Sequence, residues 1–277
     1  MSERLPPGLH IVATPIGNLG DLSPRASDTL RHADRILAED TRVTAKLLRH
    51  IGAKVPMARY DDYSSAKDRD DIVELLSEQA IALVSDAGTP LISDPGYKLV
   101  RAARAAGRPV HTVPGPSAAV AALSLAGLPT DRFLFLGFLP AKAKARAEAI
   151  VEVARVRATL VLYESGPRLG ETLAALADVL GARDAAVVRE ISKLHEETVT
   201  GTLAELAERY AAEMPKGEIV IVIGPPAQAA AASDEELDAA LDEALRRLSP
   251  SRAAAEVAEL LSLPRKRAYA RALERSR

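Results

Sequence analysis

The sequence has no cysteine and no tryptophan, and only 3% of its 277 residues are aromatic. Without cysteine, the chain can form no disulfide, no thiol nucleophile and no thiolate metal site. The five histidines are scattered without an HxH or HxxxH pairing, which argues against a histidine metal site as well. So few aromatic rings also argue against nucleic-acid recognition built on aromatic stacking of splayed-out bases.

Strong net charge and long apolar runs are also missing. The formal net charge is -2, so contact with phosphates or an anionic membrane has to come from local patches. No run approaches the roughly 18 apolar residues of a membrane span, and the N-terminus, MSERLPPGLH, lacks the apolar core of a signal peptide. Apolar residues still make up 48% of the chain, enough for a sizeable core. These features predict a soluble cytoplasmic protein of two domains plus an appendage.

Residues 1–128 predict an α/β domain with a parallel sheet. The expected strands are 9–16, 35–39, 55–60, 81–85 and 110–113, and helical patterns cover 68–80 and 97–106. Short apolar runs that alternate with helices are typical of βαβ crossovers, in which helices cover both faces of the sheet.

Residues 129–226 predict a second α/β domain, which begins near the turn-rich stretch 128–131. The expected strands are 133–138, 159–163, 185–191, 198–202 and 218–223, with helices at 142–156, 169–180 and 203–211. Two of these strands follow each other so closely, around Ile191 and Val199, that we expect them to be antiparallel. The second sheet is therefore predicted to be mixed.

The last part of the chain, 233–277, predicts a helical module that follows a small-residue linker at 227–232. Helical patterns cover 233–248, 251–261 and 265–273, and the first begins with a Ser cap and acidic residues. The first helix is mostly acidic, whereas the remainder has a surplus of basic side chains. The pattern fits a helix-turn-helix that contacts RNA, and equally a small bundle that only packs on the body or on a dimer partner.

Four predicted strands of the first domain end in unusual loops. These loops are 14–20, 39–42, 85–96 and 114–119, and they are rich in Gly, Pro and Asp. Open α/β sheets bind ligands at the carboxyl ends of their strands, so four such loops predict a pocket there. No GxGxxG follows the first strand, which argues against a nucleotide with a pyrophosphate. S-adenosylmethionine has no phosphate, and rigid Gly-Pro loops with a carboxylate partner suit it.

These segments resemble the tetrapyrrole-methylase superfamily, and within it the ribosomal RNA small subunit methyltransferase I branch. The resemblance is carried by long strings throughout the chain. They are ATPIGNLGDLSPRA at 13–26, AEDTR at 38–42, ALVSDAGTPLISDPGY at 82–97, PGPSAAVAALSLAGLPTDRFLFLGFLP at 114–140, LYESGPRL at 162–169, VREISKLHEETVTGTL at 188–203, KGEIVIVI at 216–223 and LSPSRAAAEVAELLSLPRKRAYARAL at 248–273. Two small departures are Ala38, where a cysteine is common, and Gly166-Pro167, where many members have other small or polar residues.

The resemblance implies an enzyme that methylates the ribose 2′-hydroxyl of a cytidine in small-subunit (16S) ribosomal RNA. It implies two α/β domains with S-adenosylmethionine in the cleft between them, and a homodimer. Because the glycines lie in Gly-Pro turns, we expect the cofactor to bind without a metal. The residues that the resemblance assigns to the cofactor are Asp86, Gly88, Thr89, Pro90, Ile92, Ser117 and Ala118 from the first domain, and Leu162, Tyr163 and Glu164 from the second.

A ribose hydroxyl is a poor nucleophile unless a base removes its proton or a cation stabilises the developing alkoxide. We interpret Lys193 or Arg189 as the cation, and Glu190 or Glu39 as the base or the group that orients it. An ion-pair network with a purely structural role explains any one of these residues equally well.

Basic side chains at three places are candidates for contact with RNA phosphates. They are Arg42, Lys142, Lys144, Arg265, Lys266, Arg267 and Arg271. Two other functions remain open: a methyltransferase of the same fold that acts on a tetrapyrrole or another small molecule, and a non-catalytic RNA-binding protein of ribosome assembly. The exact nucleotide, the assembly stage of the substrate and the identity of the base are not determined by the sequence.

Overall fold

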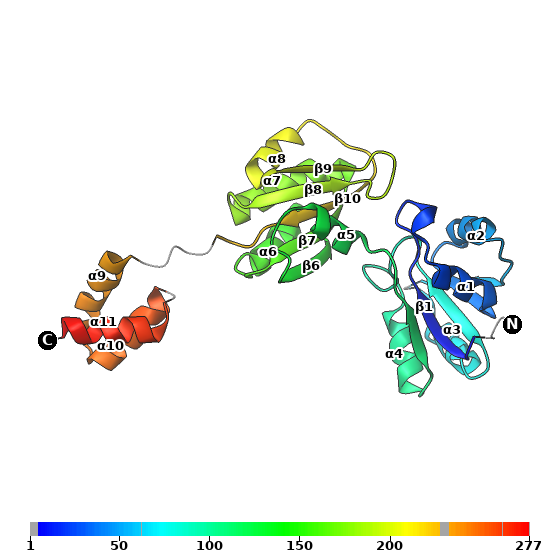
Figure 1. The fold of residues 1–277 in the computed structure, drawn as a ribbon, viewed down its shortest axis with the longest axis horizontal. Helices are drawn as coiled ribbons and strands as arrows, with labels where there is room; N and C mark the ends of the chain where they lie inside the picture. Colours follow the sequence, from blue (N-terminus) through cyan, green and yellow to red (C-terminus); the bar gives the residue numbers. More distant parts are fainter. Residues whose placement is uncertain (1–4, 62, 228–232, 262, 277) are drawn as a thin grey trace. The chain divides into compact units, whose positions relative to one another are not determined.

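The computed structural model describes residues 5–61, 63–227, 233–261 and 263–276. Their contacts divide the chain into two compact units, Met1–Pro226 and Ala227–Arg277, whose elements are labelled in Figure 1. The predicted linker lies, apart from residue 227, outside the described residues. The predicted boundary at 128–131 falls between two sheets of the larger unit and stays a prediction. No helix in the described ranges is both long enough and apolar enough to cross a membrane.

The first sheet is fully parallel, as predicted, with the strand order β3-β2-β4-β1-β5. Its strands are β1 (Gly8–Val12), β2 (Arg35–Ala38), β3 (Met57–Arg59), β4 (Ala80–Val84) and β5 (Val110–Val113). The predicted strand 9–16 is wrong at its end, because the chain leaves the sheet after Val12. Thr14 instead forms an isolated antiparallel bridge with Gly88, which joins two of the loops at the carboxyl edge.

Helices cover both faces of this sheet. They are α1 (Pro24–His32), α2 (Thr41–His50), α3 (Ala66–Leu75) and α4 (Tyr97–Ala105), and a 3-10 turn (η1) covers Leu19–Asp21. α1 and α2 pack with Ile36 and Ala82, whereas α3 and α4 pack on the other face with Leu37 and Ile81. Successive strand residues point to opposite faces, so strands that are covered on both sides read as continuous apolar runs.

The helix predicted over 68–80 differs from α3 at both ends. Ser65 caps the start of α3 and forms a capping box with Asp68, so the helix begins earlier than the apolar spacing indicates. The helix ends at Leu75, because the chain has to turn before β4 begins at Ala80. The predicted helix was too long because apolar residues of the turn and of β4 continue the helical spacing by chance.

The second sheet is mixed, as predicted, with the order β6-β7-β10-β8-β9. β6 and β7 are parallel, and the remaining neighbours are antiparallel. Its strands are β6 (Phe133–Phe138), β7 (Thr159–Ser165), β8 (Asp184–Arg189), β9 (Glu197–Thr202) and β10 (Glu218–Ile223). The short β8–β9 connection carries Glu190 and Lys193, two of the residues interpreted above as catalytic, and a third, Arg189, ends β8. The fourth, Glu39, follows β2 of the first sheet.

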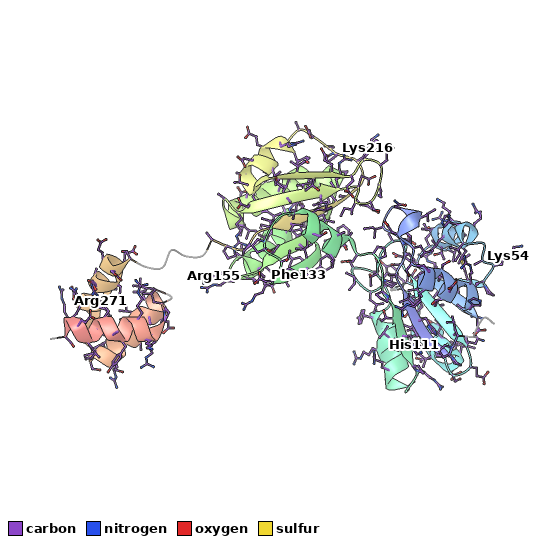
Figure 2. The ribbon with its side chains drawn as sticks, viewed as in Figure 1. Lys54, His111, Phe133, Arg155, Lys216 and Arg271 are labelled. Carbon is purple, nitrogen blue, oxygen red and sulfur yellow. The ribbon has the colours of Figure 1, made fainter. Side chains whose placement is uncertain are left out.

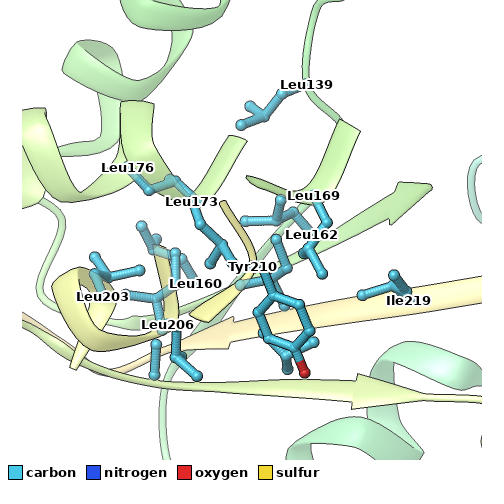
Figure 3. Close-up of a cluster of buried hydrophobic side chains, with 14 of the residues drawn as sticks. Leu139, Leu160, Leu162, Leu169, Leu173, Leu176, Leu203, Leu206, Tyr210 and Ile219 are labelled. Atoms are coloured by element: carbon cyan, nitrogen blue, oxygen red, sulfur yellow. The ribbon is translucent and has the colours of Figure 1, made fainter. Parts of the chain in front are cut away.

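The helices of the second sheet also lie on both faces. They are α5 (Ala118–Leu125), α6 (Ala143–Val153), α7 (Leu169–Leu180) and α8 (Leu203–Arg209), and a 3-10 turn (η2) covers Gly166–Arg168. α6, α7 and α8 enclose a leucine-rich core with Leu160 and Leu162. Figure 3 shows these two leucines with leucines of α7 and α8 around them. α5 covers the opposite face, where it packs with Val161 and Val220. Each fully buried leucine contributes about 1.5–3 kcal/mol, so this core holds the strand ends that face the site in place.

The smaller unit consists, among its described residues, of α9 (Asp234–Leu245), α10 (Pro250–Leu260) and α11 (Arg265–Arg275). Ser233 caps α9 through a capping box with Glu236, as its sequence predicted in part. Alanines and leucines from all three helices form a separate core, which includes Leu241, Val257 and Ala268. The predicted helical module is therefore a compact unit with a core of its own.

Candidate active site

The four unusual loops of the first sheet meet at one cavity of about 390 Å³. This volume is within the range of about 300–1,000 Å³ that small-molecule sites occupy. The first sheet and α5 contribute Ile16, Glu39, Asp86, Ala87, Gly88, Thr89, Ile92, Ser93, Asp94, Ser117 and Ala118 to its walls. The second sheet contributes Phe138, Tyr163, Glu164, Ser165, Gly217, Glu218, Ile219 and Val220. The cavity thus lies within the larger unit, and both sheets line it.

Backbone pairing between loops gives the cavity its floor. Thr14 and Gly88 exchange two hydrogen bonds, with N–O distances of 2.8 and 3.1 Å. Gly88 has a φ of +77°, in the left-handed region that a residue with a side chain rarely adopts. The hydroxyl of Thr89 donates to the carbonyl of Pro116 at 3.0 Å and joins the loop at 85–96 to the loop at 114–119. Gly88, one of the residues that the resemblance assigns to the cofactor, lies on the cavity wall.

The charge on the cavity wall is of one sign. The lining includes five carboxylates and no Lys or Arg among the described residues. The carboxylates are Glu39, Asp86, Asp94, Glu164 and Glu218. Burial raises the pKa of Asp94, although a hydrogen bond with Ser85 acts in the opposite direction. Arg168 and Lys193, which lie outside the lining, pair with two of these carboxylates, and the others leave a wall that favours a cationic ligand over one with a phosphate.

Glu164 is held in one position by its neighbours. It is buried, and it accepts hydrogen bonds from the Thr172 hydroxyl at 2.7 Å and the Ser165 amide at 2.8 Å. Arg168 pairs with it at 3.3 Å. A carboxylate with this many partners is a rigid part of the wall. It places the neighbouring Tyr163, a phenol whose pKa burial raises, against the cavity.

Most of the residues predicted to bind the cofactor line this cavity. They are Asp86, Gly88, Thr89, Ile92, Ser117, Ala118, Tyr163 and Glu164. The other two, Pro90 and Leu162, are buried behind the wall, and the Leu162 side chain lies in the core of Figure 3. Sequence reasoning missed Phe138 and Glu218, although both stand in strings that carry the resemblance. That all ten residues contact the cofactor stays a prediction.

Lys193 lies at the rim, where the β8–β9 connection reaches the first loop. Its Nζ donates to Glu190 at 2.9 Å and to Glu218, a wall residue, at 3.1 Å. A Cβ added to Gly17, beside the wall residue Ile16, would overlap the lysine side chain. Burial opposes the charged amine, but the hydrogen bonds to the two glutamates outweigh it and raise the pKa of Lys193. Lys193 is thus a fixed cation next to the cavity.

Glu190 orients that lysine. Its carboxylate accepts from Lys193 and from the backbone amide of Glu218, at 2.9 and 3.2 Å. The hydrogen bond from Lys193 lowers the pKa of Glu190, so the carboxyl is ionised. Glu190 has a φ of +52°, unusual for a residue with a side chain, and an added Cβ on Gly217 would overlap its carboxylate. Both glycines, 17 and 217, therefore leave the room that this pair occupies.

The other predicted catalytic residues lie in different surroundings. Arg189 donates to Glu197 at 3.0 and 3.1 Å and to the carbonyl of Lys216, which are contacts of a structural ion pair. Glu39 lies on the cavity wall. It also borders a second cavity of about 400 Å³, together with Asp40, Thr41, Arg42, Arg59 and Asp86. A hydrogen bond from Arg42 lowers the pKa of Asp40 to about 2.

Apart from Arg42, which pairs with Asp40, the predicted RNA-contacting cations fall into two groups. Lys142 and Lys144 are exposed at the start of α6, as are Arg265 and Lys266 at the start of α11. Lys144 also lies 4.0 Å from Glu148, one turn further along α6. Arg267 and Arg271 pair with Asp234 and Asp238 on α9. Arg271, labelled in Figure 2, donates two hydrogen bonds to Asp238, at 2.6 and 2.7 Å. These two arginines have a structural use that the sequence analysis did not anticipate.

Two family models match the chain. The family described as Tetrapyrrole (Corrin/Porphyrin) Methylases matches residues 8–207, which include both sheets as far as β9 and most of α8. The family described as the RsmI C-terminal HTH domain matches residues 225–276, which include the smaller unit.

Similar curated proteins match nearly the full chain. A protein of Erythrobacter litoralis named ribosomal RNA small subunit methyltransferase I is 56% identical over 99% of this chain and 97% of its own length. A protein of Xylella fastidiosa with the same name is 48% identical over 95% of this chain and 98% of its own length.

Solved structures match the larger part of the chain. The uroporphyrin-III-C-methyltransferase of Thermus thermophilus covers 78% of this chain and 93% of its own, with a TM-score of 0.56 and 22% identity. A diphthine synthase covers 78% of this chain and 89% of its own, with a TM-score of 0.61 and 14% identity. At these identities the likeness concerns the fold alone, and the predicted fold class is confirmed.

Proposed function

Because the chain belongs to the ribosomal RNA small subunit methyltransferase I branch of the tetrapyrrole methylases, we propose that it methylates small-subunit ribosomal RNA. The observation that carries this proposal is the likeness to the named relatives over nearly the whole chain, the C-terminal helical unit included. The methyl donor of this family is S-adenosylmethionine. The acceptor that the resemblance implies is the 2′-hydroxyl of a cytidine ribose.

The chemistry of the cavity fits this cofactor. S-adenosylmethionine is cationic at its sulfonium and amino groups and has no phosphate, so a wall of carboxylates without Lys or Arg suits it. Asp86 and the backbone at Gly88 would hold its polar end, while Ile92 and Tyr163 would enclose apolar parts and exclude water. When bound, the cofactor supplies a methyl group that the positive charge on sulfur activates.

Lys193 is the best-supported candidate for the cation that stabilises the acceptor oxygen as its proton leaves. Its raised pKa keeps the amine protonated, so it cannot serve as the base near neutral pH. Its contact with the wall residue Glu218 places it beside the cavity. Arg189, in contrast, is engaged by Glu197 and by a backbone carbonyl.

The two candidate bases differ in what surrounds them. Glu190 accepts from Lys193 and from a backbone amide, which makes it an orienting residue in our assignment. Glu39 lies on the wall of the cavity and also borders the second cavity with Arg42. We therefore assign proton removal from the ribose hydroxyl to Glu39, and orientation of the cation to Glu190.

The proposed substrate also bears on where the protein acts in the cell. Small ribosomal subunits are cytoplasmic, which agrees with the cytoplasmic location expected from the sequence. A homodimer, which the resemblance implies, stays a proposal. Light scattering at micromolar concentration tests it, with twice the chain mass of 29.4 kDa as the expected result.

Transfer of a labelled methyl group tests the function. The protein is incubated with labelled S-adenosylmethionine and one of three acceptors: small subunits that lack the modification, naked small-subunit RNA, or a tetrapyrrole precursor. We expect label in the RNA of the subunits, at a position resistant to alkaline cleavage because the 2′-hydroxyl is blocked. Label in the tetrapyrrole alone would favour a small-molecule methyltransferase. RNA binding without any transfer would favour a non-catalytic assembly protein.

A further inference from the structure

Phe138 is an exposed aromatic ring on the wall of the cofactor cavity. The side chain is 58% exposed. The chain has only three phenylalanines, so one of its few aromatic rings lies at this cavity. Leaving a large apolar side chain in water forgoes about 1.5–3 kcal/mol of burial, so a ring at the mouth of a cavity calls for a ligand to cover it.

An irregularity in β6 turns this ring toward the cavity. Phe135 pairs with Val161 and Phe138 with Tyr163, so three steps along β6 match two steps along β7. Gly137 has a φ of +62°, the left-handed conformation that such bulges often need. In a regular strand, Gly137 would lie opposite Tyr163, and Phe138 would point to the opposite face of the sheet. Bulges cost ladder hydrogen bonds and serve to redirect a side chain near functional sites.

The redirected ring contacts a tyrosine of the neighbouring strand. Tyr163 contacts Phe138 edge to face, with ring centroids 5.6 Å apart, and it contacts Phe135 in the same way at 4.9 Å. A Cβ on Gly137 would lie 2.9 Å from the hydroxyl of Ser93, another wall residue, so this glycine lets the strand approach the loop. The geometry fixes Phe138 while more than half of its surface stays open.

The charges around the ring favour a nucleobase as its ligand. The carboxylate wall repels phosphates, so an RNA chain can insert a neutral base and its ribose but has to keep its backbone outside. Lys142 and Lys144 follow Phe138 by four and six residues, and both are exposed at the start of α6. Both lysines lie outside the cavity lining, where they can neutralise the backbone phosphates of an RNA chain whose base has entered the cavity.

We propose that Phe138 stacks on the base of the target nucleotide after that nucleotide leaves its RNA strand. The assignment rests on the proposed function and adds to it the group that recognises the base. The scarcity of aromatic residues in this chain argued against recognition by stacking, but a single ring suffices for a single base. Enzymes that do chemistry on a base take its nucleotide out of the stack and hold the base against aromatic or apolar side chains, and the proposal extends this mode of binding to an enzyme that acts on the ribose.

Three variants test the proposal on the full chain. Phe138→Leu removes the aromatic ring but keeps an apolar side chain, and Phe138→Tyr keeps the ring. Phe133→Leu is the matched control, because Phe133 (labelled in Figure 2) is on the same strand, is 48% exposed, and does not line the cavity. For each variant we would measure the dissociation constant of S-adenosylmethionine by calorimetry, the KM for unmodified small subunits, and the melting temperature.

We expect Phe138→Leu to raise the KM for subunits by about tenfold or more, since stacking on an aromatic side chain contributes strongly to the binding of each base. Phe138→Tyr should restore the KM to near the parent value. In both Phe138 variants the cofactor dissociation constant should stay within about twofold of the parent value. In the control, Phe133→Leu, the KM for subunits should also stay within about twofold. An equal rise in the cofactor dissociation constant would assign the ring to the cofactor, and a KM unchanged by Phe138→Leu would exclude stacking; either result overturns the proposal. A parent enzyme that transfers no methyl group to subunits would instead refute the proposed function.

Discussion

Gly88 combines two demands at one residue, a left-handed φ of +77° and a place on the cavity wall. We expect Gly88→Val to weaken S-adenosylmethionine binding by about tenfold or more. A side chain in this conformation costs about 1–2 kcal/mol and would also enter the space that the cofactor uses. Calorimetry measures the dissociation constant.

Gly107 provides the matched control for Gly88. It has a similar φ of +67°, open space where a Cβ would go, and no part in the cavity lining. Gly107→Val should therefore lower the melting temperature while the cofactor dissociation constant stays near the parent value. If both variants bind the cofactor equally well, Gly88 does not contact it.

The Lys193–Glu190 pair makes a separate prediction about turnover. Lys193→Ala should lower kcat by about 100-fold or more, because the proposed alkoxide would lose its cation. Glu190→Gln should lower kcat less, since the neutral amide can still accept a hydrogen bond from the lysine but no longer pairs with its charge. The cofactor dissociation constant should change by only a few fold in both variants, as neither side chain lines the cavity.

Two outcomes would contradict these roles. A cofactor dissociation constant that rises as much as kcat falls would place the pair in cofactor binding. Full activity of both variants would make the pair a structural contact. Gly17→Ala adds an independent test, because its Cβ would displace the lysine without removing the charge, and we expect it to lower kcat as well.

At the scale of elements, the most specific contact is the row of ion pairs between α9 and α11. Arg267, Arg271 and Arg275 pair with Asp234, Asp238 and Asp242, so every fourth residue of each helix takes part. Exposed ion pairs contribute little one at a time, but a row with bidentate arginines fixes the register of two helices.

The row predicts how the smaller unit responds to acid. Hydrogen bonds from Arg271 and Arg275 lower the pKa values of Asp238 and Asp242 below the ordinary 3.8. A carboxyl whose pKa is lower in the folded state stabilises the fold fully above its unfolded pKa, and this contribution is lost as the pH falls through the folded pKa. We therefore expect the unit to lose stability below about pH 4, and Asp238→Asn to show a smaller loss over the same range.

The absence of cysteine makes this measurement direct. A cysteine introduced at Leu260, which is 71% exposed on α10, would carry a fluorescent label that reports only on the smaller unit. Urea unfolding followed through the label at several pH values gives the stability. If Asp238→Asn and its parent lose stability equally in acid, the pair with Arg271 does not contribute.

At the scale of the whole molecule, we predict that the larger unit binds the cofactor and that the smaller unit binds RNA. The cavity lies in the larger unit, so deletion of residues 233–277 should leave the cofactor dissociation constant unchanged. We expect the deletion to weaken binding to small subunits and to flatten its salt dependence, because fewer phosphates would be neutralised. Filter binding at a series of salt concentrations measures both effects.

A charge variant separates loss of the unit from loss of its cations. Arg265 and Lys266 are exposed and form no ion pair within the described residues, so changing both to Glu should reproduce part of the deletion and leave the unit folded. A truncated protein that binds and methylates subunits as well as the full chain would show that the unit serves packing or dimerisation.

The sequence by itself determined the order and kind of most elements and the edge at which the site lies. Short apolar runs between helices require parallel strands with both faces covered, and parallel strands bring their carboxyl ends to one edge. The loops at 14–20, 39–42, 85–96 and 114–119 therefore had to meet, and residues of all four line the cavity. Such rules depend on local spacing, which a sequence displays directly.

Only the tertiary structure decided which side chains are used where. Arg271 meets Asp238 because helix packing sets the register of segments 33 residues apart, which no local pattern encodes. Phe138 faces the cavity because one extra residue in β6 changes the side to which it points. Lys193 fits at the rim because Gly17, which is far away in the sequence, has no side chain to occupy the same space. Contacts of this kind depend on distances between segments that fold together, and those distances exist only once the sheets and helices have packed.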